Sequence, residues 1–291
     1  MKSLIHTVLL LAAAFVICIF VQSASAEVAF SENPDAVERI ADSVFMLEVY
    51  GKNHSRIAIG SGFIAFKRNL IVTNYHVIEG ASYIVANSDD NERFAVESVV
   101  AVDEKLDIAI LQLSSNASFA PLIFDTETVL KRSMRVVAIG SPAGLMNTIS
   151  IGNISAFYHD STKDWIQFTA PISSGSSGGP LLNDQGKVIG VTTATYASAQ
   201  NVNMAVRAAD VVNLYNHSSA YSNVSQITSS ASHEGEQTIT DNDQDIMLVY
   251  VTGGGKKYHL NPSCSRMRNP KQINLLEAIQ QGYEPCGICY R

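Results

Sequence analysis

Gly175-Ser176-Ser177-Gly178-Gly179-Pro180 is the stretch from which the rest of this sequence can be interpreted. Small residues of this kind let a backbone turn sharply, bring a serine hydroxyl to the surface and leave amide N–H groups facing one spot. Taken alone, such a run is more typical of a plain loop or linker. It indicates chemistry only if partner residues occur elsewhere in the chain.

Two upstream stretches supply those partners. His76 lies in Thr73-Asn74-Tyr75-His76-Val77, directly after an apolar run, and Asp107 begins the apolar segment Asp107-Ile108-Ala109-Ile110-Leu111. Each residue alone is more typical of an ordinary half-buried histidine or a strand-end carboxylate. A nucleophilic serine, however, needs a base, and the base needs an orienting acid. His76, Asp107 and Ser177 therefore predict a catalytic triad.

The joint pattern resembles the trypsin-like serine peptidases, and most closely their HtrA/Deg branch. The resemblance covers about residues 40 to 210. The family often has Asn or Asp just before the nucleophile, where this chain has Ser176, a departure that affects loop geometry more than chemistry. The matching motifs are Gly60-Ser61-Gly62-Phe63-Ile64, Thr73-Asn74-Tyr75-His76-Val77, Leu106-Asp107-Ile108-Ala109, Ile139-Gly140-Ser141-Pro142-Ala143-Gly144-Leu145 and Gly175-Ser176-Ser177-Gly178-Gly179-Pro180-Leu181-Leu182.

The resemblance implies two six-stranded antiparallel β-barrels, with His76 and Asp107 on the first and Ser177 on the second. Ser177 would attack a peptide carbonyl, His76 would carry the proton, and Asp107 would orient the imidazole. Backbone N–H groups of Gly175 and Ser177 are the expected oxyanion donors. The expected partners are protein or peptide substrates, and catalysis by such a site needs no cofactor.

The resemblance also locates the primary specificity pocket. It would be lined by residues just before the serine and by the strand after it, namely Pro171, Ile172, Val191 and Thr192. None of the four is acidic, so the pocket has nothing to pair with a Lys or Arg side chain. We therefore expect cleavage after small or medium aliphatic residues.

The hydrophobic pattern independently indicates an all-β barrel or sandwich, because short apolar runs are broken by turn residues without a long helical periodicity. A closing helix is predicted over Val206 to Tyr215, with apolar residues at Val206, Ala209, Val212 and Tyr215. The short runs are 44–50, 57–66, 70–73, 82–85, 94–102, 108–113, 136–140, 149–156, 165–169 and 188–193.

The first 26 residues have the features of an export signal. Lys2 is their only charge, Val8 to Val21 is apolar, and Ala24-Ser25-Ala26 offers small residues for cleavage before Glu27. A peptidase domain over residues 27–215 would then be periplasmic or secreted. The alternative is a retained membrane anchor, because Leu4 to Val21 approaches the length that spans a bilayer.

Composition limits the other function classes. The chain is 46% hydrophobic and 16% charged, as in an ordinary globular protein, and its formal net charge is −7. A net negative field gives no strong evidence for binding nucleic acid. The sequence does not indicate an oligomeric state.

Residues 216–245 are rich in Ser, Asn, Thr and Gln, carry acidic residues and lack Lys and Arg, which predicts a solvated linker. The remaining residues, 246–291, are too few for the PDZ domain that often follows HtrA-type peptidases. They contain His259, Cys264, Cys286 and Cys289, a set of nitrogen and sulfur ligands suited to a structural tetrahedral zinc site.

The tail resembles small Ada-like metal-binding modules and is expected to be an α+β unit stabilised by a bound zinc ion. Asn274 to Glu277 resembles a capping box, and a short helix is predicted over Leu275 to Gln281. One disulfide plus a free thiol is the alternative, since an oxidising compartment favours disulfides.

Two functions remain open from the sequence. The first is an exported serine endopeptidase that acts in protein quality control or processing. The alternative is a non-catalytic or latent binding protein on a peptidase scaffold, with the zinc tail as its recognition element. The intact triad and the glycine-rich loop favour the first.

Overall fold

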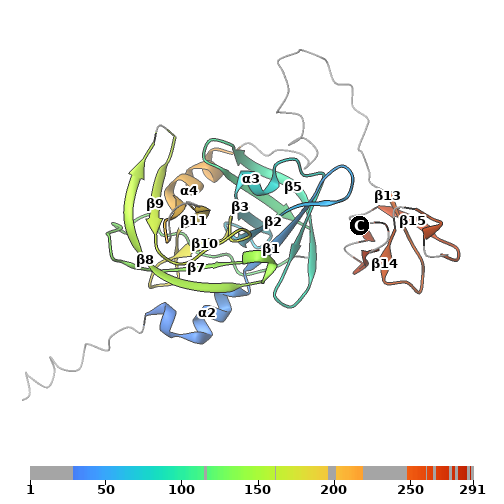
Figure 1. Ribbon diagram of the computed structural model, residues 1–291, viewed down its shortest axis with the longest axis horizontal. Helices are drawn as coiled ribbons and strands as arrows, with labels where there is room; N and C mark the ends of the chain where they lie inside the picture. Colours follow the sequence, from blue (N-terminus) through green and yellow to red (C-terminus); the bar gives the residue numbers. More distant parts are fainter. Residues whose placement is uncertain are drawn as a thin grey trace, which may run out of the picture.

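Two closed barrels dominate the computed structural model, and a small module follows them in the chain (Figure 1). The structure describes residues 29–114, 117–160, 162–195, 201–218, 248–259, 261–264, 267–274, 277–278, 281–286 and 289. The predicted signal over 1–26, nearly all of the predicted linker and most of the predicted helix over 275–281 lie outside these residues. The all-β fold with two six-stranded antiparallel barrels is confirmed.

The first barrel closes in the strand order β1-β2-β3-β6-β5-β4. Alternating side chains explain its core: Phe45, Leu47 and Val49 of β1 point inward, as do Ile84 and Ala86 of β4. Every neighbouring pair of strands is antiparallel. The strands are β1 (Val44–Tyr50), β2 (Arg56–Ile64), β3 (Leu70–Thr73), β4 (Tyr83–Asn87), β5 (Arg93–Asp103) and β6 (Ile108–Leu113).

The second barrel closes in the order β10-β11-β12-β9-β8-β7. Its interior is filled by side chains such as Ile154, Ile166 and Phe168, all at most 2% exposed. The strands are β7 (Arg135–Gly140), β8 (Thr148–His159), β9 (Asp164–Phe168), β10 (Pro180–Leu182), β11 (Val188–Thr195) and β12 (Asn203–Arg207).

A third apolar cluster joins the two barrels. It brings Phe63 and Val72 of the first barrel together with Ile139 and Val188 of the second, all at most 1% exposed. Burial of this shared apolar surface fixes the position of one barrel against the other. A cleft of defined shape between two barrels needs such a fixed arrangement.

Short helices complete the described part of the two barrels. The helix α2 (Pro34–Ala41) begins at Asn33, whose side chain accepts a hydrogen bond from the Ala36 amide at 3.2 Å. The other elements are α3 (Tyr75–Ile78), α4 (Ala208–His217) and the 3-10 turns η1 (Phe30–Glu32) and η2 (Pro142–Gly144).

The closing helix begins two residues later than predicted. Val206 belongs to strand β12, where it pairs with Val191 and with Trp165 and is fully buried. A β-branched side chain fits such a ladder well. The helix α4 instead buries Ala208 and Val211.

The tail forms two small sheets around the His and Cys residues. Strand β13 (Leu248–Val251) pairs with β15 (Lys271–Asn274), and β14 (Lys257–Tyr258) pairs in parallel with β16 (Glu284–Pro285). Across all residues that the structure describes, no helix has both the length and the apolar character needed to cross a bilayer.

Candidate active site

A single helical turn, α3, carries His76. The residue before this turn is Asn74, which is fully buried. Its side-chain amide donates to the backbone oxygen of Asp107 and to Oγ1 of Thr193, both at 2.8 Å. One amide therefore ties the histidine turn to the aspartate segment and to the second barrel.

Asp107 stands directly before β6 with a left-handed backbone, φ 59°. Its carboxylate accepts hydrogen bonds from the His76 amide at 2.9 Å and from His76 Nδ1 at 2.8 and 3.0 Å. An ionised carboxylate only accepts, so Nδ1 carries the hydrogen and Nε2 presents a lone pair. Asp107 thus selects the imidazole tautomer that a general base needs.

Two glycines shape the turn at Ser177. Gly175 has φ 98° and Gly178 has φ 90°, a region that L side chains rarely adopt. A Cβ at Gly175 would collide with the Ser141 carbonyl oxygen, and one at Gly178 would collide with the Ser61 carbonyl oxygen. Both positions therefore demand glycine.

The hydroxyl of Ser177 donates to the backbone oxygen of Thr193 at 3.0 Å. Within the described part of the chain, no hydrogen bond joins Ser177 to His76, although both residues line one cleft. Proton transfer therefore requires the hydroxyl to turn from the Thr193 carbonyl towards Nε2. Catalytic hydrogen bonds of this kind often shorten only when substrate binds.

Two backbone N–H groups of residues that line the cleft have no acceptor among the described residues. The Ser174 carbonyl accepts from the Ala143 amide at 2.8 Å, and in a trans peptide the following N–H, that of Gly175, points the opposite way. The amides of Ser176 and Gly178 are bonded to Ser173 and Thr192. Those of Gly175 and Ser177 donate to no residue that the structure describes, so both can bind an oxyanion.

Ser61 is a functional residue that sequence reasoning does not single out. Its hydroxyl donates to the Gly175 carbonyl at 2.7 Å and accepts from the Ser141 amide at 2.8 Å, and it is fully buried. Its own amide donates to the Ser177 carbonyl at 2.7 Å. This strand residue of the first barrel therefore holds residues 175–177 of the second, here called the oxyanion loop. Only its place in the Gly-Ser-Gly motif points to it in the sequence.

The open cleft between the barrels has a volume of about 540 Å³. Residues 56–59 of β2 form one wall together with His76 and Val77, while Ala143, Gly144 and the oxyanion loop form the other. Among the described residues that line the cleft, Arg56 carries the only permanent positive charge.

The predicted specificity residues lie apart from this lining. Val191 is fully buried in the core between the barrels, and Thr192 Oγ1 donates to the Ser176 carbonyl at 2.7 Å. Pro171 is exposed, and Ile172 packs on the core of the second barrel. None of the four is among the residues that line the cleft.

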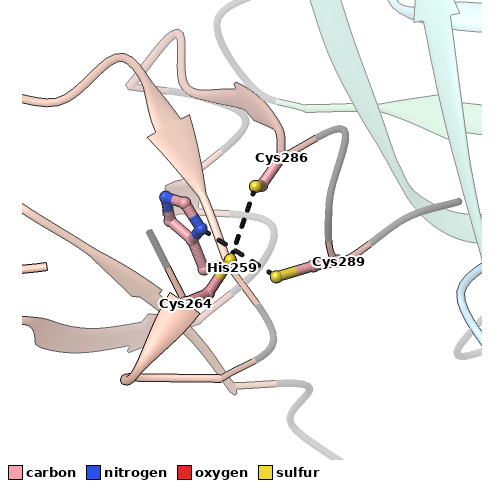
Figure 2. A group of neighbouring side chains, drawn as sticks. All are labelled: His259, Cys264, Cys286 and Cys289. Atoms are coloured by element: carbon pink, nitrogen blue, oxygen red, sulfur yellow. Dashed lines mark hydrogen bonds between the residues drawn. The ribbon is translucent and has the colours of Figure 1, made fainter. Parts of the chain in front are cut away.

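The metal-ligand residues of the tail converge (Figure 2). One donor atom from each of His259, Cys264, Cys286 and Cys289 lies within 4.8 Å of all the others. The Sγ atoms of Cys264 and Cys286 are 3.7 Å apart, and Cys289 Sγ is 3.9 Å from His259 Nδ1. A tetrahedron with Zn–S bonds of about 2.3 Å has edges of about 3.8 Å, so the four residues fit such a site.

The spacing of the sulfur atoms and the surroundings of His259 also suit a metal. The 3.7 Å between the Sγ atoms of Cys264 and Cys286 is longer than a disulfide bond of about 2.05 Å and close to the ligand spacing of a tetrahedral site. Burial, helped by the charge of Lys257, lowers the pKa of His259 and favours the neutral imidazole that binds metal. This group could hold a metal ion.

Comparison with known proteins agrees with the geometry of the barrels. Residues 60–191 match the family model of the trypsin-like peptidase domain. This chain contains a trypsin-like peptidase domain. The domain is similar to the human serine protease HTRA4, with 37% identity over 171 residues, which cover 54% of this chain and 36% of that protein.

Other proteins are similar to this chain over comparable lengths. The anti-sigma-I factor RsgI9 of Acetivibrio thermocellus is 33% identical over 186 residues, 61% of this chain and 26% of that protein. The solved Rv3671c protease from M. tuberculosis, active form, superposes with a TM-score of 0.57 at 25% identity, over 66% of this chain and 89% of that chain. This chain spans only 26% to 46% of the length of the first curated relatives.

Proposed function

We propose that this chain is a serine endopeptidase whose triad is His76, Asp107 and Ser177. One observation carries the proposal: His76, which is hydrogen-bonded to Asp107, lines the same cleft as Gly175 and Ser177, whose amides donate to no described residue. An isolated histidine pair or an isolated glycine loop would lack this joint geometry. Protein or peptide substrates are the class that such a site acts on.

Each group has a defined task in this mechanism. Ser177 Oγ attacks the carbonyl carbon, and its proton passes to His76 Nε2 while Asp107 stabilises the imidazolium. The Gly175 and Ser177 amides bind the oxyanion, and each such donor supplies about 2.7 to 4 kcal/mol in the transition state. His76 then protonates the leaving amine, and water releases the acyl group by the same route.

The test is covalent labelling with a fluorophosphonate, followed by mapping of the modified residue. We expect modification of Ser177 in the wild-type chain and its loss in His76→Ala, because only an activated serine reacts at a useful rate. Unmodified Ser177 under all metal and pH conditions would contradict the proposal and favour a non-catalytic binding protein.

Two further properties belong to the same proposal. We propose export across a membrane, supported by the charge and apolar pattern of residues 1–26. A preference for small or medium aliphatic side chains before the scissile bond is supported by the lining of the cleft, whose described residues include Ile57 and Ile59 and no carboxylate that could pair with Lys or Arg.

We propose that the metal bound by the tail is zinc and that its role is structural. All four ligand positions are filled by protein atoms, three of them sulfur, which leaves no place for a reactive water. A module of this size buries too little apolar surface to fold by its core alone.

Metal analysis of the purified full chain tests this assignment. We expect one equivalent of zinc per chain in the wild type and almost none in His259→Ala or Cys286→Ser, because each change removes one of four ligands. His217→Ala is the matched control, since this exposed histidine of α4 lies outside the cluster. A wild-type chain prepared without chelator that holds no zinc would contradict the assignment.

A further inference from the structure

An apolar face of the first barrel points away from the barrel core. In β4, Ile84 and Ala86 fill the core, so Tyr83 and Val85 point outward. Val85 is nevertheless fully buried and Tyr83 is 5% exposed. The outer face formed by Tyr50, Tyr83, Val85 and Ala95, here called the tyrosine face, must therefore be covered by another part of the chain.

The tail module is what covers it. One continuous cluster joins the tyrosine face to side chains from β13, β14 and β15 of the module. At its centre, Tyr50 and Tyr83 stack with ring centroids 4.6 Å apart, and Tyr258 is fully buried beside them. The module contributes Val249, Val251, Tyr258, Ile273 and Ala278, with Tyr283 at the edge. Figure 1 shows the module beside the first barrel.

Tyr258 is also held by the metal-ligand segments. It directly precedes His259, and its carbonyl accepts from the amide of Cys286 at 3.0 Å. It pairs with Pro285 in the short sheet of β14 and β16. Two of the four ligands therefore flank the docking tyrosine, so loss of the metal should disorder the residue that contacts the barrel.

One carboxylate links this interface to the cleft. Tyr50 of the tyrosine face donates a hydrogen bond to Glu48 Oε2 at 3.2 Å. Arg93 is 3.5 Å from Glu48, and the same Glu48 carboxylate binds Arg56 at 2.8 Å. Arg56 lines the cleft. Glu48 thus connects Tyr50 of the tyrosine face with Arg56 in the wall of the cleft.

We propose that metal binding docks the tail module on the tyrosine face, and that docking positions Arg56 through Tyr50 and Glu48. The proposal rests on the metal site and the peptidase activity proposed above. Loss of the metal exposes the tyrosine face to solvent and leaves Arg56 able to adopt other positions in the cleft. The chain therefore couples metal occupancy to how well the cleft binds its substrate, and the chemical step is left unchanged because Arg56 is not one of the three triad residues.

Small-angle scattering of the full chain measures docking without any reference to activity. The 29 residues between Ser218 and Leu248 connect the two parts. A polar chain of this length spans on the order of 30 Å, so an undocked module increases the maximum dimension by tens of ångströms. We expect zinc-loaded protein to be compact and chelated protein to be extended.

A barrel variant separates docking from metal binding. Ala95→Glu places a charge in the interface, so we expect an extended chain that retains its zinc. Ser98→Glu is the matched control, because Ser98 is a partly exposed residue of the same strand outside the cluster. For a peptide that fills the cleft, Ala95→Glu should raise KM several-fold and leave kcat within about twofold.

Three results would overturn the proposal: equal dimensions for loaded and chelated chains, a compact Ala95→Glu variant, or an extended Ala95→Glu variant with unchanged KM. A chain that binds no zinc overturns both the metal site and the coupling. Failure of the peptidase assignment is recognised separately, because fluorophosphonate would then leave Ser177 unmodified even in the compact, zinc-loaded chain.

Discussion

Replacement of Ser177 by alanine is expected to lower kcat for peptide hydrolysis by about 10⁶-fold. The variant keeps the cleft and the backbone amides of residues 175 and 177. Its residual activity therefore comes only from substrate binding and oxyanion stabilisation. The fold should be retained, because the Ser177 hydroxyl makes one hydrogen bond, to the Thr193 carbonyl at 3.0 Å. We expect the free energy of unfolding to change by no more than about 1 kcal/mol.

Initial rates on a peptide library and chemical denaturation together measure this prediction. Ser176→Ala is the matched control, since its hydroxyl accepts only a long hydrogen bond, 3.4 Å, from the Ser173 amide. That variant should keep its rate within a few-fold. A Ser177→Ala enzyme within tenfold of wild type, or a Ser176→Ala enzyme as inactive as Ser177→Ala, would contradict the assigned nucleophile.

Much of the barrel fold can be predicted because it depends on local patterns. The predicted runs 44–50, 70–73 and 108–113 coincide with strands β1, β3 and β6. Strand β10, only three residues long, escapes prediction because Pro180 and the preceding glycines are typical of a loop. The pattern places Val206 in a helix because a short apolar run does not distinguish a strand from a helix, and only its pairing with β11 and β9 decides.

The candidate site shows where such reasoning stops. The triad His76, Asp107 and Ser177 and the four metal ligands can be predicted from residue types and their spacing along the chain. The contacts of Asn74 and Ser61, by contrast, join segments more than a hundred residues apart in the chain. The tyrosine face is equally nonlocal, because nothing in the alternating pattern of β4 tells which element covers its outer side.

Ser61 supports a second prediction with a large effect. Without its hydroxyl, the buried Gly175 carbonyl and the Ser141 amide both lose their partner. An unsatisfied buried polar group costs about 1 to 3 kcal/mol, so the oxyanion loop gains other conformations of comparable energy. Removing one oxyanion donor lowers kcat by about 10² to 10³, and misorienting the Gly175 amide should cost a part of this.

We therefore expect Ser61→Ala to lower kcat by about 10- to 100-fold and to change KM by less than about threefold, because the oxyanion forms only after substrate binds. A peptide boronic acid, which mimics the tetrahedral state, should bind more weakly by the same factor as kcat. Ser43→Ala is the matched control: its buried hydroxyl donates to the Ala120 carbonyl at 2.8 Å, and neither residue lines the cleft. Equal losses of kcat in the two variants, or a rise in KM at constant kcat for Ser61→Ala, would show that Ser61 supports the fold and not the oxyanion hole.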